Sequence, residues 1–210
     1  MNLDCLFKEK KLDPTKICCH SGGASGSDTE FEIYLEKFGI PTRAYSWKTN
    51  YHQSHNKVEI TKEDYDEGVT EIKKANKILK RWGVERYMNL LARNWAQVKY
   101  SDQVIAIGRI LNPGEKGSKG YKNISSMPIV DGGTGYAVTM AILNKRIVNV
   151  FDQYRGKWYR WSYTTDNFIE CDLPTIVCEN FAGIGTREIN ELGKDAIKNI
   201  CDKSFNFISL

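Results

Sequence analysis

The hydrophobic positions of this chain follow two periods, one typical of helices and one typical of buried strands. From Phe31 to Phe38, apolar residues recur at i, i+3, i+4 and i+7, which predicts a helix over 27–38. Thr61, followed by acidic residues, predicts the N-cap of a long helix that breaks near Gly83, with a second helix after the break. Short apolar runs predict strands at 16–20, 42–47, 104–107, 129–130, 146–151 and 175–178.

Strands that alternate with helices predict an α/β fold: a Rossmann-like, mostly parallel sheet with helices on both faces. Residues 158–163 and 168–171 flank a polar turn, which predicts a small β-hairpin excursion over about 157–171. The aromatic residues that share one face of this hairpin predict packing on the sheet or a subunit contact. No internal repeat or linker divides the chain, so we expect a single domain over 1–210.

The composition and charge of the chain limit the classes of ligand and partner that we expect. The chain is 41% hydrophobic and has a net charge of +4 that is dispersed along it. This charge suits an anionic small ligand and argues against nucleic acid as a partner, because DNA binding usually needs a basic stripe. No apolar run approaches the ~20 residues of a membrane span, and the first residues do not resemble a signal peptide, so we expect a cytoplasmic protein without a membrane partner.

The cysteines and histidines predict neither a metal site nor a cofactor. The six cysteines form no C-x-x-C pair, so we expect buried, reduced thiols. His52 and His55 lie in a polar loop, where a metal site and idle exposed side chains are both possible and the second is the commoner case.

Three glycine-rich segments, at 21–26, 131–135 and 182–186, each follow an apolar run and precede a helical pattern. Such a junction favours anion binding, because glycines let the backbone approach a phosphate and the helix start offers free N–H groups. Ligands of parallel sheets bind at the carboxyl ends of the strands, where all three turns would meet if their strands are parallel. The three turns together predict a phosphate-bearing, nucleotide-like ligand. The predicted ligand-binding residues are Ser21, Gly22, Gly23, Ala24, Gly26, Asp28, Gly108, Arg109, Gly132, Gly133, Thr134, Gly135, Gly183, Ile184, Gly185, Thr186 and Arg187.

Several charged residues have alternative interpretations. Arg187, expected in the first turn of a helix over 187–202, and Arg109 could bind phosphate or lie idle at the surface. Asp28 could accept hydrogen bonds from a ribose or a base, or could only face the helix dipole. Arg93 or Asn94 could face the pocket, and the long segment 109–127 could close over it as a lid.

The three glycine motifs together resemble the SLOG superfamily. This superfamily includes the LOG-type ("lysine decarboxylase-like") phosphoribohydrolases, the DNA-processing protein A fold and nucleotide-sensing domains of bacterial defence systems. Its S-G-G-A-x-G-x-D motif is matched at 21–28, its G-G-T-G motif at 132–135 and its A-G-I-G-S-R-E motif at 182–188, with Thr186 in place of serine. The resemblance covers residues 16–202 and is strongest to uncharacterised phage and bacterial members.

Two departures from the family pattern matter. The A-G-I-G-S-R-E strand comes last here rather than first, which looks like a circular permutation and predicts that the strand near 175–181 lies beside the strand near 16–20, with the chain ends close together. Thr139 stands where LOG-type hydrolases carry an active-site glutamate. A hydroxyl cannot replace a carboxylate that activates water, so LOG-type hydrolysis is not expected unless Asp28, Glu32 or Asp131 supplies one.

The resemblance implies a protein that binds an ADP-ribose derivative or a cyclic nucleotide signal. Phage relatives imply that it sequesters an immune second messenger as an anti-defence protein, and relatives of this fold imply a homo-oligomer. The alternative is an N-glycosidic or phosphodiester hydrolase of nucleotides that uses Asp28 or Glu32. A DNA-binding role is the third possibility.

Overall fold

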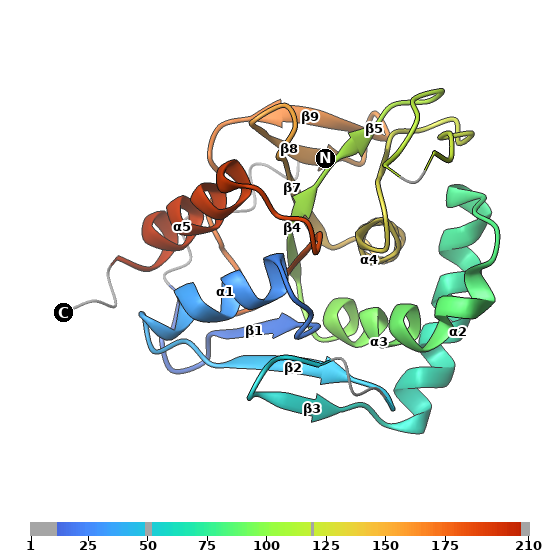
Figure 1. Ribbon diagram of the computed structural model, residues 1–210. Coiled ribbons are helices and arrows are strands. Elements are labelled where there is room, and N and C mark those ends of the chain that lie inside the picture. The colour runs from blue at the N-terminus through green and yellow to red at the C-terminus, as the bar shows by residue number, and fades with distance from the viewer. Residues whose placement is uncertain (1–11, 49–51, 119, 207–210) are drawn as a thin grey trace.

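The computed structural model describes residues 12–48, 52–118 and 120–206, and it has a Rossmann-like α/β architecture (Figure 1). The central sheet has the strand order β3-β2-β1-β10-β4-β7-β8-β9, in which β3 through β7 are parallel and β8 and β9 run antiparallel at one edge. Its strands are β1 (Cys18–Ser21), β2 (Thr42–Ser46), β3 (Lys57–Glu59), β4 (Gln103–Gly108), β7 (Ile147–Asp152), β8 (Lys157–Ser162), β9 (Asn167–Cys171) and β10 (Asn180–Gly185).

Helices cover both faces of this sheet, as the sequence predicts. Helices α1 and α5 lie on one face and α2, α3 and α4 on the other (Figure 1). The helices are α1 (Ser27–Glu36), α2 (Lys62–Leu79), α3 (Met88–Lys99), α4 (Thr134–Leu143) and α5 (Glu191–Phe205), and a short 3-10 helix, Val84–Tyr87, precedes α3. Thr61 caps α2 as expected, because its hydroxyl accepts from the N–H of Asp64 at 3.0 Å.

The strand predicted at 175–178 is wrong, and β10 begins only at Asn180. Ile176 is buried, but its N–H donates to Ser204 Oγ at 2.9 Å and that of Val177 donates to Gln103 Oε1 at 2.8 Å. Side chains therefore satisfy a backbone that the apolar run alone would assign to a strand. As a consequence, Gly183 and Gly185 lie inside a strand and not in a turn after it.

The helix predicted from Arg187 begins later, at Glu191. Asn190 is its N-cap, and its side-chain oxygen accepts from the N–H of Gly193 at 2.9 Å. Arg187 therefore lies in the loop between β10 and α5.

The second glycine turn follows β6 (Ile129–Val130), which pairs antiparallel with β5 (Ile110–Leu111) and not with the central sheet. The segment 109–127 therefore has secondary structure of its own, which includes a bridge between Lys116 and Lys122. The second turn accordingly does not follow a parallel strand, although it opens α4 as predicted.

The predicted hairpin is present as β8 and β9, and it extends the central sheet instead of leaving it. Trp161 and Phe168 pack in the core beneath α4, and Tyr159 and Tyr163 lie against the same cluster. These aromatic side chains thus pack on the sheet, one of the two roles expected for them.

Strand β10 pairs in parallel with β1, as the circular permutation predicts; the chain ends lie outside the described residues. Within the described residues no disulfide forms, and Cys19 and Cys201 are buried as expected, whereas Cys18, Cys171 and Cys178 are only half-buried. None of the helices in the described ranges is long and apolar enough to cross a membrane.

Candidate functional site

A cavity of about 750 Å³ opens at the carboxyl ends of β10 and β4, beside the turn that starts α4. Strands β1 and β4 flank β10, and the chain leads from them to opposite edges of the sheet. This is the switch point at which open α/β sheets bind ligands, and the volume lies within the ~300–1,000 Å³ of small-molecule sites.

The cavity brings together most of the predicted ligand-binding residues from all three glycine segments. Those that line it are Ala24, Asp28, Gly108, Arg109, Gly132, Gly133, Thr134, Ile184, Gly185, Thr186 and Arg187. Those that do not line it are Ser21, Gly22, Gly23, Gly26, Gly135 and Gly183.

The first glycine turn is already occupied by the protein's own side chains. With its amide oxygen facing the turn, Gln97 accepts from the N–H of Gly22 at 2.9 Å. The N–H of Ala24 donates to Asp28 Oδ2 at 3.3 Å, and His52 covers Gly23, where an added Cβ would overlap the imidazole ring. This turn therefore does not offer the open N–H cradle that its sequence suggests.

Two of the predicted binding glycines are explained by packing. A Cβ on Gly183 would lie 2.7 Å from Cγ of Phe31, so this glycine lets α1 approach β10. Gly26 has φ 93° and lies against the backbone of Thr186 and Arg187, where a Cβ would come within 2.6 Å. Both glycines are required by close approach of the chain to itself.

Asp28 and Arg93 form a buried ion pair at the floor of the cavity. Nη1 of Arg93 lies 3.9 Å from Oδ2 of Asp28, and it donates to Gln97 Oε1 at 2.7 Å. Burial raises the pKa of the Asp28 carboxyl, and the charge of Arg93 and N–H groups including that of Ala24 lower it only in part. Burial likewise lowers the pKa of the Arg93 guanidinium. A carboxyl with a perturbed pKa in a cavity is a candidate functional group.

Asn94 follows Arg93 on α3 and also lines the cavity, so both residues that the sequence left open face it. The Asn94 side chain is 9% exposed, and its amide has no hydrogen-bond partner within the described residues. Its polar atoms reach the open space of the cavity, where a ligand could hydrogen-bond to them. Trp95 belongs to the core, as expected.

The second glycine turn offers the free N–H groups that the first lacks. Among the described residues, none accepts a hydrogen bond from the N–H of Gly133 or Thr134, which begin α4 beside the cavity. Arg81 donates to the carbonyl oxygens of Gly132 and, at 2.8 Å, Val130, so those carbonyls are held by the arginine. The α4 N-terminus therefore presents unpaired donors to an anion.

Asp131 holds the neighbouring loop against this turn. Its carboxylate accepts from the Ser118 N–H at 2.7 Å, from the Gly132 N–H at 2.7 Å and from the Tyr121 hydroxyl. These hydrogen bonds outweigh burial and lower its pKa. The Asp131 carboxylate is therefore committed to structure.

Arg109 and Arg187 each bring a guanidinium group to the cavity. Neither side chain has an ion-pair or hydrogen-bond partner in the part of the chain that is described, although Arg109 lies 5.2 Å from the ring of Tyr154. The cavity lining as a whole is basic, since Lys80, Arg81, Arg93, Arg109, Lys122 and Arg187 outnumber Asp28, Asp131 and Glu188. Unpaired arginines in such surroundings suit a phosphate.

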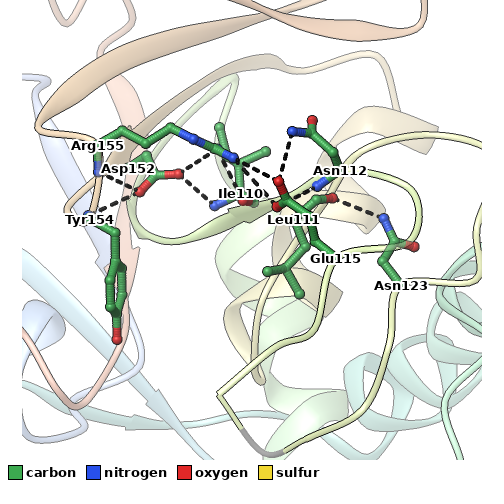
Figure 2. A network of polar contacts seen from close by, with 8 residues as sticks. All are labelled: Ile110, Leu111, Asn112, Glu115, Asn123, Asp152, Tyr154 and Arg155. Carbon is green, nitrogen blue, oxygen red and sulfur yellow. Dashed lines mark hydrogen bonds and ion pairs between the residues drawn. The ribbon is translucent and has the colours of Figure 1, made fainter.

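A buried carboxylate fixes the rim from which Tyr154 projects (Figure 2). Asp152 accepts from the N–H groups of Ile110 and Tyr154, both at 3.0 Å, and binds Nη1 of Arg155 at 2.8 Å. Arg155 Nη1 also donates to the carbonyl of Ile110 at 3.0 Å, and within the 109–127 segment Asn123 donates to the carbonyl of Leu111 at 2.9 Å. This segment is therefore anchored in place beside the cavity.

Glu32, the second candidate carboxylate, points elsewhere. It accepts from Ser54 Oγ and Asn56 Nδ2, both at 2.6 Å, and does not line the cavity. Thr139 is buried in α4 and is also away from the cavity. Within the described residues, no cluster of three or more His, Cys, Asp or Glu side chains could hold a metal ion.

Several lining residues are not predicted by the sequence pattern, among them Arg81, Trp82, Tyr87, Gln97 and Tyr121. Arg81 and Trp82 follow a long helix, where nothing in the local pattern signals a site. Their position depends on α2 packing against α4, which no local pattern reveals.

Comparisons of the chain with protein-family models, with curated proteins and with solved structures find no match.

Proposed function

We propose that this protein binds a nucleotide-derived small molecule in the cavity between β10, β4 and α4. One observation carries the proposal: the cavity places the unpaired N–H groups of Gly133 and Thr134 together with the free guanidinium groups of Arg109 and Arg187. Helix N-termini and arginines both prefer anions, and phosphate can accept from several donors at once.

The floor of the cavity suits the uncharged part of such a ligand. Asp28 is an acceptor that repels phosphate, whereas the amide of Asn94 both donates and accepts. Sugar hydroxyls or the polar edge of a base would satisfy both side chains. The ligand would then bind with its phosphate at the α4 N-terminus and its hydroxyls or base toward α3.

The resemblance to SLOG proteins supports an ADP-ribose derivative or a cyclic nucleotide signal as the ligand. Its phage members support the proposal that the protein sequesters an immune second messenger as an anti-defence protein. Assembly into a homo-oligomer in the cytoplasm belongs to the same proposal, and light scattering of the purified protein tests the assembly.

A hydrolase is the second candidate, and Asp28 is the observation that favours it. Its buried carboxyl has a raised pKa and lines the cavity, as a general acid or base requires. The reaction would be cleavage of an N-glycosidic or phosphodiester bond of a nucleotide.

Native mass spectrometry with a nucleotide panel tests the proposal. The panel holds AMP, NAD, ADP-ribose, cyclic ADP-ribose isomers and cyclic di- and trinucleotides, and each mixture is also separated by liquid chromatography. Intact ligand recovered from a protein complex supports the binder. A new product that is lost in Asp28→Asn but not in Glu32→Gln supports the hydrolase, and a panel without any mass shift or product contradicts both.

A further inference from the structure

The mouth of the cavity carries aromatic side chains that the fold leaves in water. Trp82 is 95% exposed, although it lines the cavity, and Tyr87 and Tyr154 line the same mouth at 56% and 62% exposure. Aromatic rings bury large areas when they find a partner, so exposed rings gathered at one cavity indicate a binding surface.

The residues on either side of Trp82 have a defined backbone conformation. The preceding Arg81 donates its N–H to Asn76 Oδ1 at 3.1 Å, and Asn76 Nδ2 donates to the carbonyl of Arg81 at 3.0 Å. Lys80 and Gly83 bracket the segment in the left-handed conformation, with φ 50° and 68°. The exposure of Trp82 therefore follows from a defined turn between α2 and the 3-10 helix.

Arg81 also connects this turn to the proposed anion site. Its guanidinium group binds the carbonyl of Gly132, directly before the unpaired N–H groups that begin α4. Trp82 thus directly follows Arg81, the residue that holds the second glycine turn. Leu91 and Val84 supply apolar lining in the same cavity.

We propose that Trp82 is the stacking platform for the planar base of the ligand, and that the preferred ligand is therefore a purine nucleotide. The proposal rests on the proposed function and deepens it, because it assigns the base to the rim and leaves the phosphate to α4, Arg109 and Arg187. Stacking strength grows with ring area, so a purine gains more than a pyrimidine, and a sugar phosphate gains nothing.

Calorimetric titrations with AMP, UMP and ribose 5-phosphate test this assignment on the wild-type chain, Trp82→Ala and Trp82→Phe. In the wild type we expect AMP to bind about tenfold more tightly than ribose 5-phosphate, with UMP between them. Trp82→Ala should remove most of this difference while leaving the affinity for ribose 5-phosphate unchanged, and Trp82→Phe should retain most of it. Ile169→Ala is the control, since Ile169 is an exposed apolar side chain on β9 that does not line the cavity.

Acrylamide quenching gives a second readout that is independent of affinity. Of the chain's five tryptophans, Trp95, Trp158 and Trp161 are buried and Trp47 is half-buried, so Trp82 is the most accessible. AMP should protect tryptophan fluorescence from quenching in the wild type but not in Trp82→Phe, and ribose 5-phosphate should protect neither.

The outcomes separate the two proposals. Equal affinity for all three probes, unchanged in Trp82→Ala, overturns the stacking platform and leaves phosphate binding in place. Probes that all fail to bind, together with an empty nucleotide panel, overturn the proposed function and this inference with it. A changed oligomeric state in Trp82→Ala with an unchanged ratio of probe affinities assigns the ring to a subunit contact and also overturns it.

Discussion

Arg93 and Asp28 lie opposite each other at the floor of the cavity, with Nη1 3.9 Å from Oδ2 and both side chains 7% exposed. Burial moves both pKa values toward the neutral forms, which shows that this separation does not fully offset the loss of water. The pair joins α1 to α3 across the ends of β1 and β10, and Gln97 completes it.

Removal of either partner should destabilise the fold. Asp28→Asn leaves the Arg93 guanidinium buried without a countercharge. Arg93→Met likewise leaves the Asp28 carboxylate buried without a countercharge. Each substitution should lower the free energy of unfolding by about 3 kcal/mol. The double variant should recover at least about 1 kcal/mol relative to the sum of the two, because it removes both charges. Urea denaturation of the four proteins measures this coupling, and additive losses would show that the pair contributes none.

A carboxylate at the start of α4 should abolish anion binding without harming the fold. Gly133 has helical φ and ψ, and a Cβ there would have its nearest neighbour at 4.0 Å, so Gly133→Asp is accommodated. The aspartate should stabilise α4 by about 0.3–1 kcal/mol through the helix dipole while repelling phosphate from the cavity. Gly133→Asn is the control of equal size without charge. Equal binding of AMP by the two variants would remove the α4 N-terminus from the site.

Arg187 and Arg109 should each contribute to phosphate affinity. Hydrogen bonds from charged donors contribute about 1.5–3 kcal/mol, so Arg187→Gln or Arg109→Gln should weaken AMP binding about tenfold or more. Both variants should also reduce the salt dependence of binding. Lys198→Gln, on the exposed side of α5, removes the same charge away from the cavity and should leave affinity unchanged in titrations at two salt concentrations.

His20 should make stability depend on pH. Burial lowers its pKa below 6.5, although Asn180 raises it in part, and the ring also faces Tyr45, Tyr100, Arg43 and Asp102. Between 6.5 and the lower pKa of His20 in the folded protein, the unfolded chain binds more protons than the folded one. The contribution of neutral His20 to stability is therefore fully present above pH 6.5, and it is lost as the pH falls to the pKa of His20 in the folded protein. Each unit of lowering corresponds to about 1.4 kcal/mol.

His20→Gln cannot take up this proton. The variant should therefore lose less stability than the wild type between about pH 7 and pH 5, as urea denaturation at several pH values would measure. His52, whose pKa burial also lowers, keeps a pH dependence of its own in this variant. Parallel pH profiles for the two proteins would contradict the assignment to His20.

Gly183→Ala separates the packing role of this glycine from a binding role. The new methyl group would press on Phe31 and Cys19, so the free energy of unfolding should fall by about 1–3 kcal/mol. The protein that remains folded should bind AMP as the wild type does, because Gly183 does not line the cavity. Thermal unfolding and titration of the same sample measure both effects, and lost affinity at unchanged stability would restore Gly183 to the binding site.

The local sequence alone determined the α/β class and the positions of most helices and strands from its hydrophobic pattern, and the cap at Thr61 from a threonine followed by acidic residues. These features depend on backbone periods and on hydrogen bonds between near neighbours, which local sequence encodes. The strand at 175–178 failed because Ser204 and Gln103 satisfy its backbone from other parts of the chain. A short apolar run shows that a segment is buried, but it does not show what its backbone bonds to.

The tertiary structure decided which glycine turn could hold an anion. All three turns look alike in sequence, yet Gln97, Asp28 and His52 fill the first, and Gly183 packs against Phe31 in the third. Within the described residues, the turn at Gly133 keeps two N–H groups without an acceptor beside the cavity, and Arg81, from the segment after α2, donates to the carbonyls next to them. Whether an N–H group is free depends on acceptors that folding brings from distant segments, so sequence could indicate the turns and only the fold could distinguish them.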